Sequence, residues 1–113
     1  MARSATTSDV FNAIAEAHRR EILDVLSEGE KPVGAIVRDV SLSQPQVSKH
    51  LRVLTEVGLV SSRPDGRFRL YRLEPDRLAP LQEWLAKYEK AWHSRMDRVD
   101  DYLKELQRQG EVE

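Results

Sequence analysis

The tightest constraint on the fold comes from residues 42–54, which carry the start, the buried stripe and the polar face of one short helix. Ser43 is a favourable N-cap, and Gln46, three residues later, completes a capping box. Pro45 falls in the first turn, where its missing N–H is not needed. The segment therefore predicts a capped amphipathic helix. Its buried stripe, at helical spacing, is expected to be Val47, Leu51 and Leu54.

The opposite face of this helix is polar and cationic. Amides, hydroxyls and cations on one narrow exposed face match the base edges and phosphates of a DNA major groove. Glutamine can bond adenine through both amide atoms and serine accepts several bases, so we expect Gln44, Gln46 and Ser48 to contact base edges. Lys49 and Arg52 can reach guanine or phosphate, and phosphate is favoured for Arg52.

Three shorter helices are expected before this one. Apolar spacing predicts them over residues 10–15, 18–27 and 33–40. A tight turn at residues 41–42 then leads into the capped helix. The third helix, this turn and the capped helix together form a helix-turn-helix, the arrangement that places its second helix in a major groove.

A basic β-hairpin is expected to follow. Gly58 is placed to end the capped helix, residues 59–63 fit a strand, and Pro-Asp-Gly at 64–66 is a strong turn signal. Residues 67–73 alternate charged and apolar side chains at period two, as in a second strand. The residues that compete for its inner face are Phe68, Leu70, Tyr71 and Leu73. Such a hairpin after a helix-turn-helix predicts a wing that contacts DNA backbone or the adjacent minor groove through Arg63, Arg67 and Arg69.

Charge is unevenly distributed along the chain. The formal net charge is −1, but residues 31–73 hold eight basic and three acidic residues, a net charge of +5. A basic middle between acidic ends is the electrostatic pattern of a nucleic-acid-binding protein. The alternative, that helix surfaces are simply charged, accounts less well for this segregation.

The last third of the chain reads as one long helix. No glycine or proline occurs between Leu81 and Gly110, and apolar residues recur there every three or four positions. A helix of about 28 residues would be roughly 40 Å long, more than a domain of this size covers by itself. We therefore expect its stripe to pack against a second copy, giving a homodimer; the alternative is a helix packed wholly on its own domain. The expected interface residues are Leu81, Leu85, Tyr88, Trp92, Met96, Val99 and Leu103.

These motifs, in this order, resemble the ArsR family of bacterial winged-helix repressors. The resemblance covers residues 10–73 and is strongest in residues 42–54, followed by Gly58-Leu59-Val60. It is also seen in HRREIL at 18–23 and RLYRL at 69–73. The resemblance implies a homodimer that binds a palindromic operator in double-stranded DNA and blocks transcription, often from its own promoter.

The expected fold is mainly α with a small β-hairpin, a winged helix-turn-helix with a long C-terminal dimerisation helix. We expect one domain over residues 1–113. Its expected parts are the N-terminal helices (1–30), the helix-turn-helix (31–58), the wing (59–73) and the dimerisation helix (74–110).

The chain departs from the metal-sensing members of this family. Where those members carry a Cys-x-Cys pair, Pro32 and Gly34 stand here, and the chain has no cysteine at all. Another subgroup has Asp and His ligands on the C-terminal helix, where His93 and Asp97 lie four residues apart in this chain. A metal-responsive repressor using that pair is the alternative within the family. The metal-independent type is favoured, and no cofactor is expected.

Other classes of function find little support in the sequence. Ser48 has no His-Asp pattern or nucleophile-elbow glycines around it, and no glycine-rich phosphate loop occurs, so an enzyme is not expected. No apolar run reaches the length of a membrane span, and residues 1–9 lack the apolar core of a signal peptide, so we expect a cytoplasmic protein without a membrane partner. A winged-helix protein-interaction module is the rival outside the class. The inducer, whether metal or small molecule, is not identified by the sequence.

Overall fold

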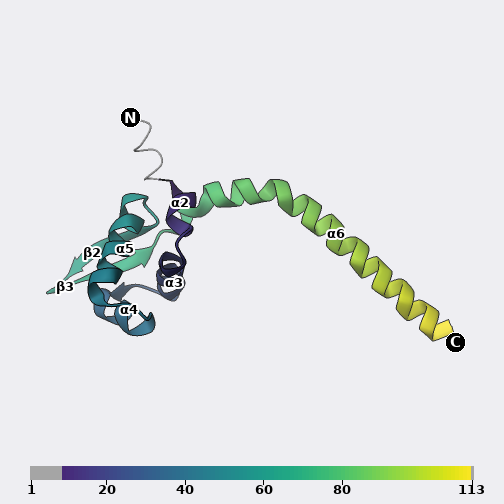
Figure 1. Cartoon of the computed structure of the whole chain (residues 1–113), viewed down its shortest axis with the longest axis horizontal. Coiled ribbons are helices and arrows are strands. Elements are labelled where there is room, and N and C mark those ends of the chain that lie inside the picture. The colour runs from purple at the N-terminus through teal and green to yellow at the C-terminus, as the bar shows by residue number, and fades with distance from the viewer. Residues whose placement is uncertain (1–8, 113) are drawn as a thin grey trace. The chain divides into compact units, whose positions relative to one another are not determined.

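A computed structural model of the chain describes residues 9–112 (Figure 1). The chain divides into two compact units, Met1–Pro80 and Leu81–Glu113, which are described separately below. Residues 1–8, most of the segment expected to lack a signal peptide, lie outside the described residues. In the part of the chain that is described, no helix is both long enough and apolar enough to cross a membrane.

The first unit contains the expected helices. They are α2 (Val10–Ile14), α3 (Ala17–Leu26), α4 (Val33–Asp39) and α5 (Gln44–Glu56). All four predictions are confirmed, with bounds that differ by a residue or so. Residues 40–43 connect α4 to α5 and complete the helix-turn-helix.

The start of α5 is the predicted capping box. The hydroxyl oxygen of Ser43 accepts a hydrogen bond from the backbone N–H of Gln46 at 3.3 Å, and Gln46 Oε1 accepts one from the backbone N–H of Ser43 at 2.9 Å. At the other end, Gly58 has φ +84°, a left-handed conformation that favours glycine. A Cβ at Gly58 would also lie 3.3 Å from the guanidinium carbon of Arg77. Both ends of α5 are therefore fixed by local chemistry.

Two arginines join α2 to α3. Arg19 Nε donates to the carbonyl oxygen of Ala13 at 2.6 Å, and Arg20 Nη1 donates to that of Ile14 at 2.8 Å. The last carbonyls of a helix have no partner within it, so these guanidinium groups satisfy the C-terminal end of α2. Helix α2, only five residues long, is thus held by side chains of the helix that follows it.

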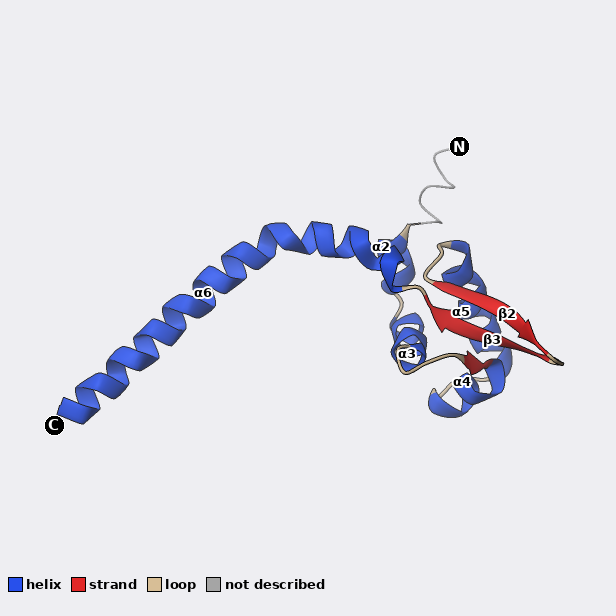
Figure 2. Cartoon of the chain, turned by 180° about the vertical axis from the view of Figure 1, so that it is seen from behind, coloured by secondary structure: helices blue, strands red, loops and turns tan. Residues whose placement is uncertain are grey.

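The sheet has one strand more than the sequence predicted. Strands β1 (Lys31–Pro32), β2 (Val60–Asp65) and β3 (Phe68–Leu73) form an antiparallel sheet in the order β1-β3-β2 (Figure 2). A two-residue strand is too short to show an alternating pattern, which is why β1 was missed. The 3-10 helix η1 (Pro75–Leu78) follows β3.

The hairpin turn begins two residues later than expected and ends one residue later. Asp65 pairs with Phe68, so the turn consists of Gly66, with φ +64°, and Arg67. The predicted turn at 64–66 is therefore wrong, because Pro64 belongs to β2 and pairs with Arg69. β2 is an edge strand, where a proline is tolerated since one side of the strand needs no ladder hydrogen bond.

The register of β3 also settles which of its apolar side chains face inward. Tyr71 and Leu73 pack against the core, whereas Phe68 is 63% exposed. The core itself lies between the helices and the sheet. Its largest fully buried side chains are Ile22, Ile36, Val47, Leu54, Leu59 and Val60.

The second unit is formed by α6 (Ala79–Val112), a helix of 34 residues. It begins later than residue 74, where the dimerisation helix was expected to begin, because residues 75–78 form η1, and it continues past residue 110, where that helix was expected to end. Pro80 does not delay the start, because proline fits the first turn of a helix. Gly110 does not end it, because one glycine in a helix costs only about 1 kcal/mol relative to alanine.

Candidate nucleic-acid interface

The polar face of α5 is exposed as its spacing predicted. Gln44, Ser48, Lys49 and Arg52 are exposed, while the stripe beneath them is buried. The capping box and the packed stripe hold this face on a rigid element, as a surface for base recognition requires. The roles of these four residues in binding DNA stay predictions.

Gln46 has a second task besides the one predicted for it. Its Oε1 accepts hydrogen bonds from the backbone N–H and the hydroxyl of Ser43, at 2.9 and 3.1 Å. A bidentate contact with adenine requires both the oxygen and the nitrogen of the amide. With its oxygen engaged in the cap, Gln46 has its amide nitrogen left for a base, so Gln44 is the better candidate for bidentate reading.

His50 lies on the side of α5 that faces α3. Its ring centroid is 6.1 Å from that of His18, and its Nδ1 is buried without a hydrogen-bond partner among the described residues. Burial, with the nearby charge of Arg19 as the next cause, holds the pKa of His50 below its ordinary value. The shift favours the neutral imidazole, whose ring lies against that of His18 between α5 and α3.

The wing arginines occupy three different environments. Arg63 forms a two-point ion pair with Glu30, with Nε to Oε2 at 3.0 Å and Nη2 to Oε1 at 2.9 Å. That hydrogen bonding holds the pKa of the Glu30 carboxyl below its ordinary value. Arg67 is exposed in the hairpin turn. Arg69 Nε and Nη2 both donate to the hydroxyl of Ser62, at 3.2 and 3.1 Å.

The strand register assigns these arginines to different faces of the sheet. Ser62 pairs with Tyr71 and Pro64 pairs with Arg69, so these residues share one face. Tyr71 packs against the core on that face, which places Arg69 on the side of the sheet nearer α5. Arg63 is one residue out of phase and lies on the opposite face.

That opposite face is rich in internal ion pairs. Arg72, whose partner across the strands is Ser61, donates to Glu74 Oε2 at 3.0 Å. The hydroxyl of Ser61 donates to the same oxygen, and these two bonds hold the pKa of Glu74 below its ordinary value. The basic charge of this face is therefore partly neutralised by carboxylates of the same chain. DNA binding by Arg63 stays a prediction, because a phosphate would have to compete with Glu30 for this side chain.

The metal alternative rests on a pair of residues in α6. His93 and Asp97 are both exposed, four residues apart on the helix. Across the described residues, no group of three or more potential ligands comes together in a way that could hold a metal ion. Metal binding by His93 and Asp97 therefore stays a prediction, and no third ligand for it is found among the described residues.

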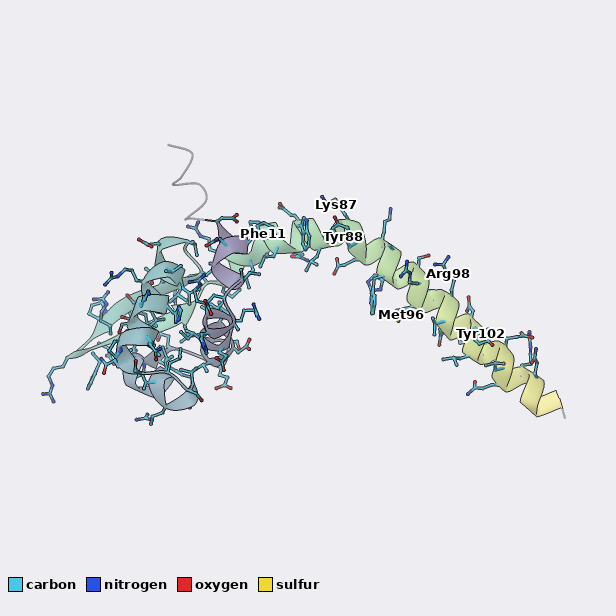
Figure 3. All side chains as sticks on the ribbon, viewed as in Figure 1. Phe11, Lys87, Tyr88, Met96, Arg98 and Tyr102 are labelled. Atoms are coloured by element: carbon cyan, nitrogen blue, oxygen red, sulfur yellow. The ribbon has the colours of Figure 1, made fainter. Side chains whose placement is uncertain are left out.

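The apolar stripe of α6 lies open in the single chain. Of the seven predicted interface residues, all except Leu81 are exposed, with fractions from 40% for Met96 to 58% for Trp92. Figure 3 shows Met96 and Arg98 projecting from opposite sides of α6. At this point of the helix the apolar stripe and a basic side chain therefore lie on different sides. An exposed apolar surface of this length is the usual mark of an interface.

Known proteins similar to this chain are regulators of transcription. The family model described as bacterial regulatory protein, arsR family, matches residues 17–62. The HTH-type transcriptional regulator Rv2034 of Mycobacterium tuberculosis is 41% identical over 78 residues, which are 69% of this chain and 73% of that protein. The transcriptional repressor SdpR of Bacillus subtilis is 32% identical over 81 residues, 72% of this chain and 90% of that protein.

The chain is also similar to a solved structure of a winged helix-turn-helix protein. It is the solution structure of the homodimeric winged helix-turn-helix DNA-binding domain Mb0332 from Mycobacterium bovis, with a TM-score of 0.60 and 30% identity. The match covers 77% of this chain and 82% of that one. The winged helix-turn-helix fold and the resemblance inferred from the motifs are both confirmed. The chain belongs to the ArsR family of bacterial regulatory proteins.

Proposed function

We propose that this chain is a homodimeric repressor that binds an inverted-repeat operator in double-stranded DNA and is not an enzyme. The observation that carries the proposal is the exposed polar face of α5, held by a capping box at one end and a buried stripe beneath. The family supports regulation of transcription, and the basic wing beside α5 supports DNA as the partner rather than a protein.

Each protomer inserts α5 into one major groove. In this arrangement Gln44, Ser48 and the amide nitrogen of Gln46 contact base edges, while Lys49 and Arg52 contact guanine or phosphate. Arg67 and Arg69 reach the backbone or the adjacent minor groove, and Arg63 joins them only when it leaves Glu30. Because its proposed partner is promoter DNA in a bacterial cell, we place the protein in the cytoplasm.

The dimer forms through α6, whose exposed stripe packs against the same stripe of a second copy. A two-fold dimer presents its recognition helices about 34 Å apart, one turn of DNA, or a multiple of that spacing. The operator is therefore an imperfect inverted repeat. In this role residues 1–113 work as a single winged helix-turn-helix domain with a dimerisation helix.

The salt dependence of DNA binding tests the proposed contacts between basic side chains and phosphates. If Lys49, Arg52, Arg67 and Arg69 each neutralise a phosphate, a dimer neutralises about eight, and the slope of log K against log salt is expected near −7. Gel retardation of the DNA upstream of the gene, over a range of salt concentrations, gives this slope. A slope near zero would contradict the proposed contacts.

Base recognition and backbone binding are separated by two substitutions. Gln44→Ala is expected to reduce the preference for operator over random DNA by about 1–3 kcal/mol, because one base contact is lost. Arg67→Ala is expected to weaken binding to all sequences alike, because it removes only a backbone contact. Competition titrations measure both, with the exposed Gln82→Ala on α6 as the control. Equal behaviour of the Gln44 and Arg67 variants would refute this division of roles.

A further inference from the structure

We propose that a hollow between α5 and the wing strands seats one phosphate of the DNA backbone, and that Thr55 and Ser62 bind it. The inference rests on the proposed function, which it deepens. Neither residue belongs to the base-reading face or the arginines of the wing. The assignment follows from the shape of the first unit and from the geometry of a DNA duplex.

The hollow has a volume of about 400 Å³ and is lined from both sides. Ser48, Arg52 and Thr55 line it from α5, and Ser62 and Tyr71 line it from the sheet. Spacings of four and three residues put the three residues of α5 on one face of that helix. This face continues the base-reading surface toward the wing, and Figure 2 shows α5 running beside β2 and β3.

A DNA duplex brings a backbone strand to this place. The major groove and the adjacent minor groove are separated by one sugar–phosphate strand. A protein that places α5 in the major groove and its wing at the adjacent minor groove must therefore straddle that strand. The hollow lies between the two elements that straddle it. Its volume exceeds that of a phosphate group and leaves room for bridging waters, which are common in protein–DNA contacts.

The groups around the hollow suit a phosphate. Phosphate oxygens only accept hydrogen bonds, and the hydroxyls of Thr55 and Ser62 and the guanidinium of Arg52 can donate them. The Ser62 oxygen accepts from Arg69 Nε and Nη2, so its own hydrogen is left to donate to another group. Ser62 thereby also holds the Arg69 cation near the hollow. Most protein–DNA hydrogen bonds go to the backbone through such side chains.

One acidic group lines the same hollow. Glu56 follows Thr55 at the C-terminal end of α5, and its carboxylate opposes the charge of a phosphate. A free anion would meet this carboxylate as well as the cations, whereas an operator brings its phosphate already positioned by α5 and the wing. Glu56 thus lowers the affinity of the seat without removing it, and its neutralisation provides a test with the opposite sign.

The test uses the full-length protein and a duplex that it selects from a random library. Thr55→Val keeps the side-chain shape without the hydroxyl, and Ser62→Ala removes the other donor. Each is expected to raise Kd at least about tenfold, because a hydrogen bond to a charged group is lost in each protomer. Ser94→Ala, an exposed hydroxyl on α6, is the control that leaves Kd unchanged. Thermal melting checks that every variant is folded.

Glu56→Gln removes the negative charge of the acidic group beside the hollow and is expected to have the opposite effect on DNA binding. It is expected to tighten binding about threefold at low salt, since it removes a like charge beside the phosphate. The control is Asp24→Asn, which removes one negative charge from an exposed position on α3. Equal gains from the two variants would mean that only net charge matters, which would overturn the role of Glu56.

The decisive arm replaces single phosphates by uncharged methylphosphonates along the selected duplex. One position in each half-site, between the contacted major groove and the flanking minor groove, is expected to weaken wild-type binding. The same replacement is expected to weaken Thr55→Val less, because that variant has already lost one hydrogen bond to this phosphate. If Thr55→Val shows no deficit, or the same deficit on every duplex, the seat is refuted. If the protein selects no duplex at all, the proposed function fails with it. Selective binding that depends on Gln44 but not on Thr55 or Ser62 refutes the seat alone.

Discussion

Replacing Leu54 by alanine is expected to lower the free energy of unfolding by about 2–5 kcal/mol, a large fraction of the stability of a small domain. Leu54 lies on α5 and is fully buried, with 0% of its surface exposed. The substitution removes buried apolar surface and leaves a cavity that its neighbours fill only in part. Urea denaturation followed by circular dichroism measures the change.

The matched control for Leu54 lies on the same helix. Lys49→Ala changes an exposed side chain in a similar helical position and is expected to stay within about 0.5 kcal/mol of the wild type. In DNA binding the order is reversed: Lys49→Ala is expected to lower the affinity for DNA directly, because Lys49 lies on the polar face, whereas Leu54 lies in the buried stripe and contacts no DNA. A cost below about 1 kcal/mol for Leu54→Ala would show that α5 is not anchored by its buried stripe.

The elements predicted well are those with local causes. Helix α5 was predictable because Ser43 and Gln46 fix its start, Gly58 fixes its end, and the apolar stripe lies between them. Each of these signals acts within a few residues of the chain. The long helix α6 was predictable for the same reason, since its apolar period runs unbroken over many turns.

The elements predicted poorly depend on distant partners. Strand β1 exists because Lys31 and Pro32 pair with β3, almost forty residues later, and two residues carry no pattern of their own. The turn was misplaced because Pro64 signals a turn locally, while pairing with Arg69 keeps it in the edge strand β2. Non-local pairing overrides local preference in both cases.

The candidate site shows the same division. The exposure of Gln44 and Ser48 on α5 follows from helical spacing and was foreseen. The ion pair between Arg63 and Glu30 was not, because 33 residues separate the two and the register of the sheet brings them together. A count of basic residues in the wing therefore overstates the positive charge available to DNA, because Arg63 must first give up its ion pair with Glu30.

Trp92→Asp is expected to separate the dimer into monomers and to reduce operator affinity at least about 100-fold. Trp92 is 58% exposed in the single chain and lies within the apolar stripe of α6, where a large aromatic residue is a favoured anchor of an interface. An aspartate there would be buried without a partner charge, which is strongly unfavourable. A monomer also loses the gain in effective concentration that comes from holding two half-sites together.

Ser94→Asp is the matched control for this substitution. It introduces the same charge two residues away on α6, about 200° around the helix and outside the stripe, so it should leave both the dimer and operator binding intact. Sedimentation velocity measures the assembly, and gel retardation compares a full operator with a single half-site. Trp92→Asp should match the wild type on the half-site, because the first unit is unchanged. A dimer that survives Trp92→Asp, or a wild type that sediments as a monomer, would remove α6 as the dimerisation helix.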